Sequence, residues 1–115
     1  MKKIVLFAFN GDPMCFVHVL LNALDLDSRG REVKIVIEGS ATKLIPQLTE
    51  RENSMHPLFE KAKNKRILAG ACRACSHKMG VLEAVRERGL ELLDDMHGHP
   101  SMAGFMEKGF EVITF

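Results

Sequence analysis

Two cysteines separated by two residues are the most reactive feature of this chain. The motif Cys72-Arg73-Ala74-Cys75 directly follows a short apolar run, residues 67–71, and precedes a segment with helical periodicity. The thiols are therefore predicted at a strand-to-helix junction, at the carboxyl end of the strand. The first N–H groups of a helix carry about half a positive charge, which favours a thiolate over a thiol. With Arg73 and Lys78 nearby, this position predicts a lowered pKa for Cys72.

The elements that must position these thiols follow from alternating apolar runs and amphipathic stretches, a pattern typical of βα units. Strands are predicted at residues 3–9, 33–37, 67–71, 90–93 and 110–115, and helices at 13–27, 41–48, 57–64, 72–88 and 100–108. This alternation predicts an α/β fold, a three-layer α/β/α sandwich with a five-stranded, mostly parallel sheet. Residues 1–115 are expected to form a single domain.

Sites in such sheets form at the carboxyl ends of the strands, which gives a set of further candidates. The set combines polar or small residues after the first two strands, basic residues around the cysteines and two histidines after the fourth strand. Its members are Asn10, Cys15, Gly39, Arg73, His77, Lys78, His97 and His99.

Composition excludes several function classes. The net charge is +1 and there is no Trp or Tyr, so we expect no nucleic-acid partner. No stretch reaches the ~18 apolar residues of a membrane span, and the first apolar run stops at Asn10, short of a signal peptide. Three cysteines, an odd number, do not suggest a disulfide framework, so a cytoplasmic location is expected. No Gly-x-Gly-x-x-Gly or Walker loop occurs, and no cofactor is predicted.

The segment from Cys72 to Val81 resembles the active-site segment of the DsrE/DsrF/DsrH (TusBCD-like, YchN-like) proteins. The shared pattern is a strand, a cysteine, small residues, one or two basic residues and then Gly-Val, and the order of elements is similar over essentially the whole chain. The resemblance implies a DsrE-like fold, a homo-oligomer, and a cysteine that accepts sulfane sulfur as a persulfide and hands it to a partner protein. The matching residue is Cys72. Cys75 departs from the family, which usually has a small apolar residue there.

Other roles for the two cysteines stay open at this stage. CxxC before a helix is also the arrangement of dithiol redox proteins. Metal binding by Cys72, Cys75 and one of His77, His97 or His99 is a third interpretation, since zinc prefers such ligands. However, the two histidines in His97-Gly98-His99 are too close together for the usual zinc spacing, and one CxxC supplies only half of a site. We therefore expect no stoichiometric metal. A non-catalytic subunit with structural cysteines is the fourth interpretation.

The role of Cys75 depends on the helix that follows. If one continuous helix begins near Cys75, this residue shares a face with Met79, Leu82 and Val85 and packs against the sheet as a small side chain. The competing interpretation makes Cys75 a resolving thiol for Cys72.

Overall fold

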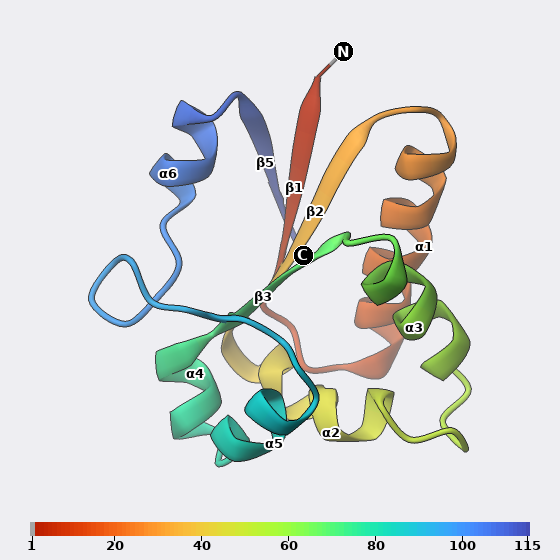
Figure 1. Ribbon diagram of the computed structural model, residues 1–115, viewed down its shortest axis with the longest axis vertical. Coiled ribbons are helices and arrows are strands. Elements are labelled where there is room, and N and C mark those ends of the chain that lie inside the picture. The colour runs from red at the N-terminus through yellow and green to blue at the C-terminus, as the bar shows by residue number, and fades with distance from the viewer. Residues whose placement is uncertain (1) are drawn as a thin grey trace.

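A five-stranded, entirely parallel sheet forms the centre of the molecule, as the alternating pattern predicted (Figure 1). The computed structural model describes residues 2–115. The strands are β1 (Lys3–Ala8), β2 (Glu32–Ile37), β3 (Leu68–Cys72), β4 (Leu92–Leu93) and β5 (Phe110–Thr114), in the order β4-β3-β2-β1-β5. The sheet lies between helical layers, which gives the three-layer α/β/α sandwich. Because β1 is covered on both faces, its residues from Ile4 to Ala8 are all buried.

The helices divide unequally between the two faces of the sheet. They are α1 (Pro13–Ser28), the 3-10 helix η1 (Gly39–Leu44), α2 (Ile45–Leu48), α3 (His56–Asn64), α4 (Arg73–Lys78), α5 (Leu82–Glu87) and α6 (Met102–Glu107). Side chains of α1, α2, α3 and α5 join the larger core on one face, while α6 packs on the other. None of the helices within residues 2–115 has the length and apolar character that a membrane crossing requires.

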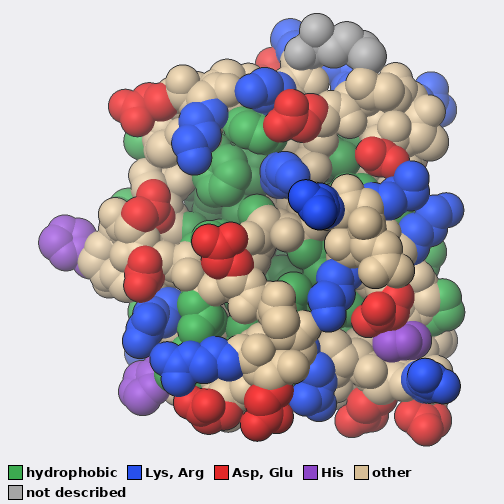
Figure 2. All heavy atoms as spheres, viewed as in Figure 1, with side chains coloured by type: hydrophobic (Ala, Val, Ile, Leu, Met, Phe, Trp, Pro, Cys, Tyr) green, Lys and Arg blue, Asp and Glu red, His purple; other side chains and the backbone are tan. Residues whose placement is uncertain are grey.

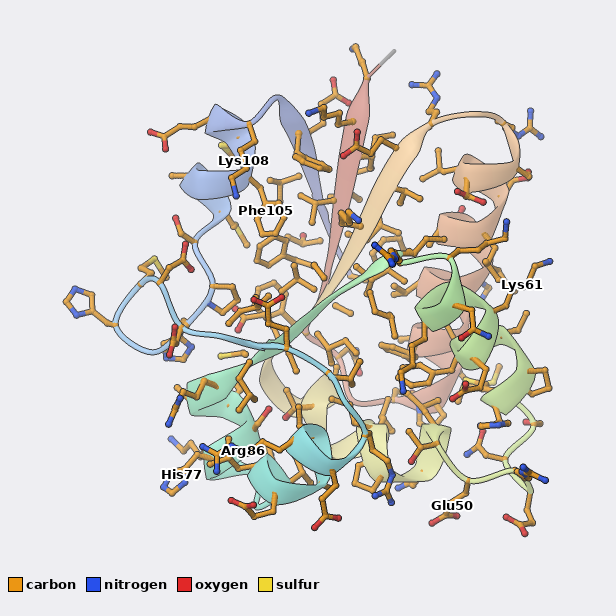
Figure 3. All side chains as sticks on the ribbon, viewed as in Figure 1. Glu50, Lys61, His77, Arg86, Phe105 and Lys108 are labelled. Atoms are coloured by element: carbon orange, nitrogen blue, oxygen red, sulfur yellow. The ribbon has the colours of Figure 1, made fainter. Side chains whose placement is uncertain are left out.

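The face under α6 is only partly covered. Phe105 points from α6 toward the strands, and its ring lies edge-on to those of Phe7 and Phe110 (Figure 3). Beside it, Figure 2 shows a hollow with hydrophobic side chains at its base and charged side chains of both signs around it. The lining of this groove includes Leu68 and Leu93. A single short helix is too small to cover five strands.

The predicted helix over residues 72–88 is wrong, because two helices occupy this segment. The α4 helix ends at Lys78, and Gly80 has a φ of 73°, a left-handed conformation that glycine adopts at low cost. The N–H of Val81 donates to the carbonyl of Ser76 at 2.9 Å and closes the turn. Cys75 therefore does not share one continuous helical face with Val85, which is fully buried in the core.

A close approach between two backbones holds β4 beside β3. Gly70 has a φ of 151°, and a β-carbon at this position would clash with the backbone carbonyl of Glu91. That carbonyl accepts a hydrogen bond of 2.8 Å from the N–H of Ala71. The residues that follow β4 run back to the carboxyl end of β3. The contact between Gly70 and Glu91 therefore also helps to position those residues.

We expect Gly70→Ala to lower the free energy of unfolding by about 2 kcal/mol or more, because it combines backbone strain with a backbone clash. Gly80→Ala is the matched control, since its φ is also positive but nothing lies within 4 Å of the added β-carbon. It should cost about 1 kcal/mol, the strain alone. Urea denaturation measures both values. Equal losses for the two variants would show that the approach of Glu91 does not constrain Gly70.

Candidate functional site

Cys72 lies at the carboxyl end of β3, where the sequence placed it. It is the last residue of the strand and the N-cap of α4, with an extended backbone (φ −60°, ψ 123°). The N–H of Cys75 donates to Cys72 Sγ at 3.3 Å. Cys72 is fully buried, whereas Cys75 is partly exposed one turn further along. The cysteine closer to the sheet is therefore the interior one of the pair.

The segment after β4 places His99 against both thiols. His97 and Gly98 have φ values of 50° and 87°, which form a tight turn, and Met96 and His99 exchange two backbone hydrogen bonds of 2.7 and 2.9 Å. The carbonyl of Gly98 accepts from the N–H of Ala74 at 2.9 Å, which joins this turn to α4. As a result, His99 Nδ1 lies 3.1 Å from Cys72 Sγ and 3.7 Å from Cys75 Sγ.

Glu38 completes the cluster and is the residue that the sequence reasoning missed. It directly follows β2, and its side chain is only 8% exposed. Its Oε1 lies 3.8 Å from Cys75 Sγ and 3.9 Å from His99 Nδ1. Within residues 2–115, no Lys or Arg side chain forms an ion pair with it. The sequence could have indicated Glu38, because residues at the carboxyl end of a parallel strand are site candidates, and Glu38 follows β2 just as Gly39 does.

The four side chains converge on one point. One ligand atom from each of Glu38, Cys72, Cys75 and His99 lies within 4.8 Å of the other three. The cluster offers two sulfur nucleophiles, an imidazole that can accept a proton, and a carboxylate. The same four atoms are also the donor types that bind a transition metal.

The environment raises the pKa of Cys72, so the predicted lowering is wrong. Burial of the thiol is the largest cause, and the neighbouring Glu38 carboxylate adds to it. The hydrogen bond from the N–H of Cys75 acts in the opposite direction but is outweighed. Arg73, which was expected to stabilise a thiolate, instead lies 3.7 Å from the carboxylate of Asp94. The resting form of Cys72 is therefore a thiol.

Of the further candidates, only His99 joins this cluster. His77 points outward from α4 (Figure 3), and Lys78 and His97 are exposed. Asn10 Oδ1 accepts a hydrogen bond from the N–H of Asp12, which places it in the turn before α1. Cys15 lies in the first turn of α1, partly buried and outside the four-residue cluster. The backbone of Gly39 packs against Phe9, so it shapes the loop rather than supplying a ligand atom.

We expect the two thiols of the reduced, metal-free protein to react with iodoacetamide in a defined order. Near neutral pH, Cys75 should be alkylated before Cys72, because Cys75 is more exposed and the pKa of Cys72 is raised. The rate at Cys72 should still increase above pH 9.0, the ordinary pKa of a thiol, because its thiolate forms only at higher pH. Peptide mapping by mass spectrometry measures each rate. Alkylation of Cys72 first, with a rate that levels off below that pH, would contradict this assignment.

The comparisons with known proteins place the chain in a family of archaeal sequences. No family model matches it, and no solved structure matches it. It is 32% identical over 97 residues to the uncharacterized protein MJ0733 of Methanocaldococcus jannaschii, a match that covers 84% of this chain and 77% of that protein. An uncharacterized protein of Archaeoglobus fulgidus is 49% identical over 41 residues, which are 36% of this chain and 67% of that protein. The chain belongs to the same family as the M. jannaschii protein.

Proposed function

We propose that this protein is a sulfur carrier that accepts sulfane sulfur as a persulfide on Cys72. One observation carries the proposal: Cys72 Sγ lies 3.1 Å from His99 Nδ1 at the carboxyl end of a parallel strand. A thiol with a raised pKa needs a base to become a nucleophile, and the imidazole is within reach of its proton. The resemblance of residues 72–81 to the DsrE-like active-site segment supports the same assignment.

The loading step balances with these groups alone. His99 Nδ1 takes the proton of Cys72, and the thiolate attacks the outer sulfur of a donor persulfide, R–S–SH. A new S–S bond forms at Cys72 as the donor bond breaks, and the electron pair leaves on R–S⁻. The imidazolium then returns its proton to the leaving thiolate. The products are Cys72–S–SH and R–SH, with no net oxidation.

Burial of Cys72 suits a carrier because it shields the persulfide from other thiols. The donor would approach past Cys75 and His99, since the side chain of His99 is 42% exposed and Cys75 is partly exposed. Approach past these two side chains would favour partners that fit the site. A partner protein that donates or accepts the sulfur is therefore part of the proposal.

The separation of the two sulfurs favours a second candidate function, dithiol exchange. The two Sγ atoms lie within 4.8 Å of each other, and an S–S bond of about 2.05 Å would require the two side chains to rotate toward each other. In a loaded protein, the Cys75 thiolate would attack the inner sulfur of Cys72–S–SH. The cysteines would then form a disulfide and release HS⁻.

The expected setting of the protein follows from the same chemistry. Three free cysteines are compatible with a reducing compartment, so we propose a cytoplasmic location. The homo-oligomer implied by the DsrE-like resemblance also stays part of the proposal, and it is testable by measuring the mass of the protein in solution.

We expect the reduced, metal-free protein to gain one sulfur atom when it is incubated with a low-molecular-mass organic persulfide, and to lose it on treatment with dithiothreitol. Cys72→Ser should abolish the gain. Cys75→Ala should load normally and keep the sulfur longer, because no second thiol is present to expel it. Cys15→Ser is the matched control and should behave as the wild type. Intact-mass spectrometry measures each outcome.

Two results would overturn the sulfur-carrier proposal. If the wild type loses two hydrogens and Cys75→Ala gains no sulfur, Cys72 does not accept sulfur and the pair functions as a redox dithiol. If Cys75→Ala prevents loading while Cys72→Ser does not, the acceptor is the exposed cysteine instead of the buried one.

The base assigned to His99 has its own test. His99→Gln should slow persulfide loading by about 100-fold near neutral pH, the lower end of a general-base contribution. Loading by this variant should recover as the pH rises, because hydroxide then removes the proton that His99 no longer takes. His97→Gln, two residues earlier and exposed, should load at the wild-type rate. A pH profile unchanged by His99→Gln would remove the imidazole from the mechanism.

A further inference from the structure

Four ligand atoms at the end of β3 lie close enough together to surround one metal ion. Zinc bonds of about 2.3 Å to sulfur and 2.0–2.2 Å to nitrogen and oxygen imply ligand-to-ligand distances of about 3.4–3.8 Å. The distances from His99 Nδ1 to Cys72 Sγ, Cys75 Sγ and Glu38 Oε1 are 3.1, 3.7 and 3.9 Å. Cys75 Sγ and Glu38 Oε1 are 3.8 Å apart. The two remaining distances, from Cys72 Sγ to Cys75 Sγ and to Glu38 Oε1, are at most 4.8 Å, so shifts of up to about 1 Å complete the geometry.

The buried carboxylate of Glu38 makes this cluster a favourable place for a cation. Glu38 is a buried carboxylate, and no Lys or Arg in residues 2–115 forms an ion pair with it. Its nearest described side-chain groups are the Cys75 thiol at 3.8 Å and the His99 imidazole at 3.9 Å. Among residues 2–115, the ion-pair partner of this carboxylate is His99, which is charged only when protonated, and a buried carboxylate is costly without a counter-charge. A divalent cation at the centre of the four atoms would supply the missing charge and a bond to each group.

The donor types select the class of metal. Two sulfurs and an imidazole are ligands for a borderline-soft ion such as Zn²⁺, and one carboxylate is too few for Mg²⁺ or Ca²⁺, which prefer oxygen. Three separate segments supply the ligands: the residue after β2, the junction of β3 and α4, and the turn after β4. The hydrogen bond from the N–H of Cys75 to Cys72 Sγ is suited to stabilise a bound thiolate.

We infer that Glu38, Cys72, Cys75 and His99 form a four-coordinate Zn²⁺ site. The two cysteines bind as thiolates and release their protons to solvent when the metal enters. This inference departs from the expectation based on the sequence, where the CxxC motif provided only half of a site. The other half consists of Glu38 and the positioned His99, which the fold brings to the same point.

The metal site does not depend on sulfur transfer, although both use the sulfur of Cys72. A thiolate that is bound to Zn²⁺ is not free to attack a persulfide, so the two occupations exclude each other. Zn²⁺ would therefore regulate the thiols by holding them in an unreactive form. Loading with sulfur would require the metal-free protein.

The test is a titration of the reduced, chelator-treated full chain with Co²⁺, followed by Zn²⁺. We expect one Co²⁺ per chain, with a thiolate-to-cobalt charge-transfer band and the intense visible bands of a tetrahedral site, and loss of both bands when Zn²⁺ displaces it. One equivalent of Zn²⁺ should protect Cys72 and Cys75 from iodoacetamide, and a chelator should reverse the protection. Cys15 is the internal control and should stay equally reactive throughout.

Variants distinguish this site from simple binding by two thiols. Glu38→Gln keeps the size of the side chain and should weaken Zn²⁺ binding by at least roughly 10- to 100-fold, as should His99→Gln. The exposed control His97→Gln should bind as the wild type does. Persulfide loading of the metal-free wild type, measured in parallel, separates this inference from the proposed function.

Two outcomes would overturn the inference. One is a wild-type protein that shows no saturable binding of Co²⁺ or Zn²⁺ at one equivalent. Because this measurement uses no variant, a folding defect cannot explain it. The other is binding by folded Glu38→Gln and His99→Gln that is as tight as in the wild type. In both cases, persulfide loading of the metal-free wild type would still test the proposed sulfur carrier by itself.

Discussion

The parallel pairing of β2, β3 and β4 is the constraint on which the site depends. Ile37 lies opposite Ala71, and Cys72 lies opposite Leu93, so the three strands end at the same edge of the sheet. Whatever follows each strand must therefore meet its neighbours there. Glu38 follows β2, α4 begins after Cys72, and the turn that carries His99 follows β4. A change in register or direction of either pair would separate these groups.

The packing that supports this edge also sets its chemistry. Because β3 has a neighbouring strand on each side, the end of the strand lies in the interior and Cys72 is fully buried. The same burial covers Glu38, and the carboxylate beside the thiol raises the pKa of Cys72. A strand end with a helix start is thus not enough to activate a cysteine. Here burial of the thiol, together with its acidic neighbour, outweighs the favourable hydrogen bond at the helix start. A base or a cation is therefore needed to bring the thiol to its thiolate form.

The proposed persulfide carrier and the proposed Zn²⁺ site are two consequences of one arrangement. Both require a thiolate at Cys72, and His99 provides for both, as a base in the first and as a ligand in the second. Glu38 separates them, because the proposed loading step has no role for the carboxylate, whereas the proposed four-coordinate site does. The turn at His97 and Gly98 matters equally to both, since its hydrogen bond to Ala74 holds the imidazole against the two sulfurs.

Local sequence patterns were sufficient for the α/β class, the parallel sheet and the position of Cys72 at a strand end. Those features depend on hydrophobic periodicity and on neighbouring residues, which are readable along the chain. The break at Gly80 was harder to predict, because an isolated glycine is tolerated in many helices and here marks a left-handed turn.

Only the tertiary structure decided which residues surround Cys72. Residues 38, 72 and 99 are far apart in the chain, and the strand order β4-β3-β2 brings them together. The pattern of apolar residues does not specify that order. Nor does it indicate how deeply a thiol is buried or which carboxylate lies beside it, and for Cys72 these two factors reversed the predicted direction of the pKa shift. The sequence by itself determined where the thiol chemistry would be, and the fold determined its partners and its protonation.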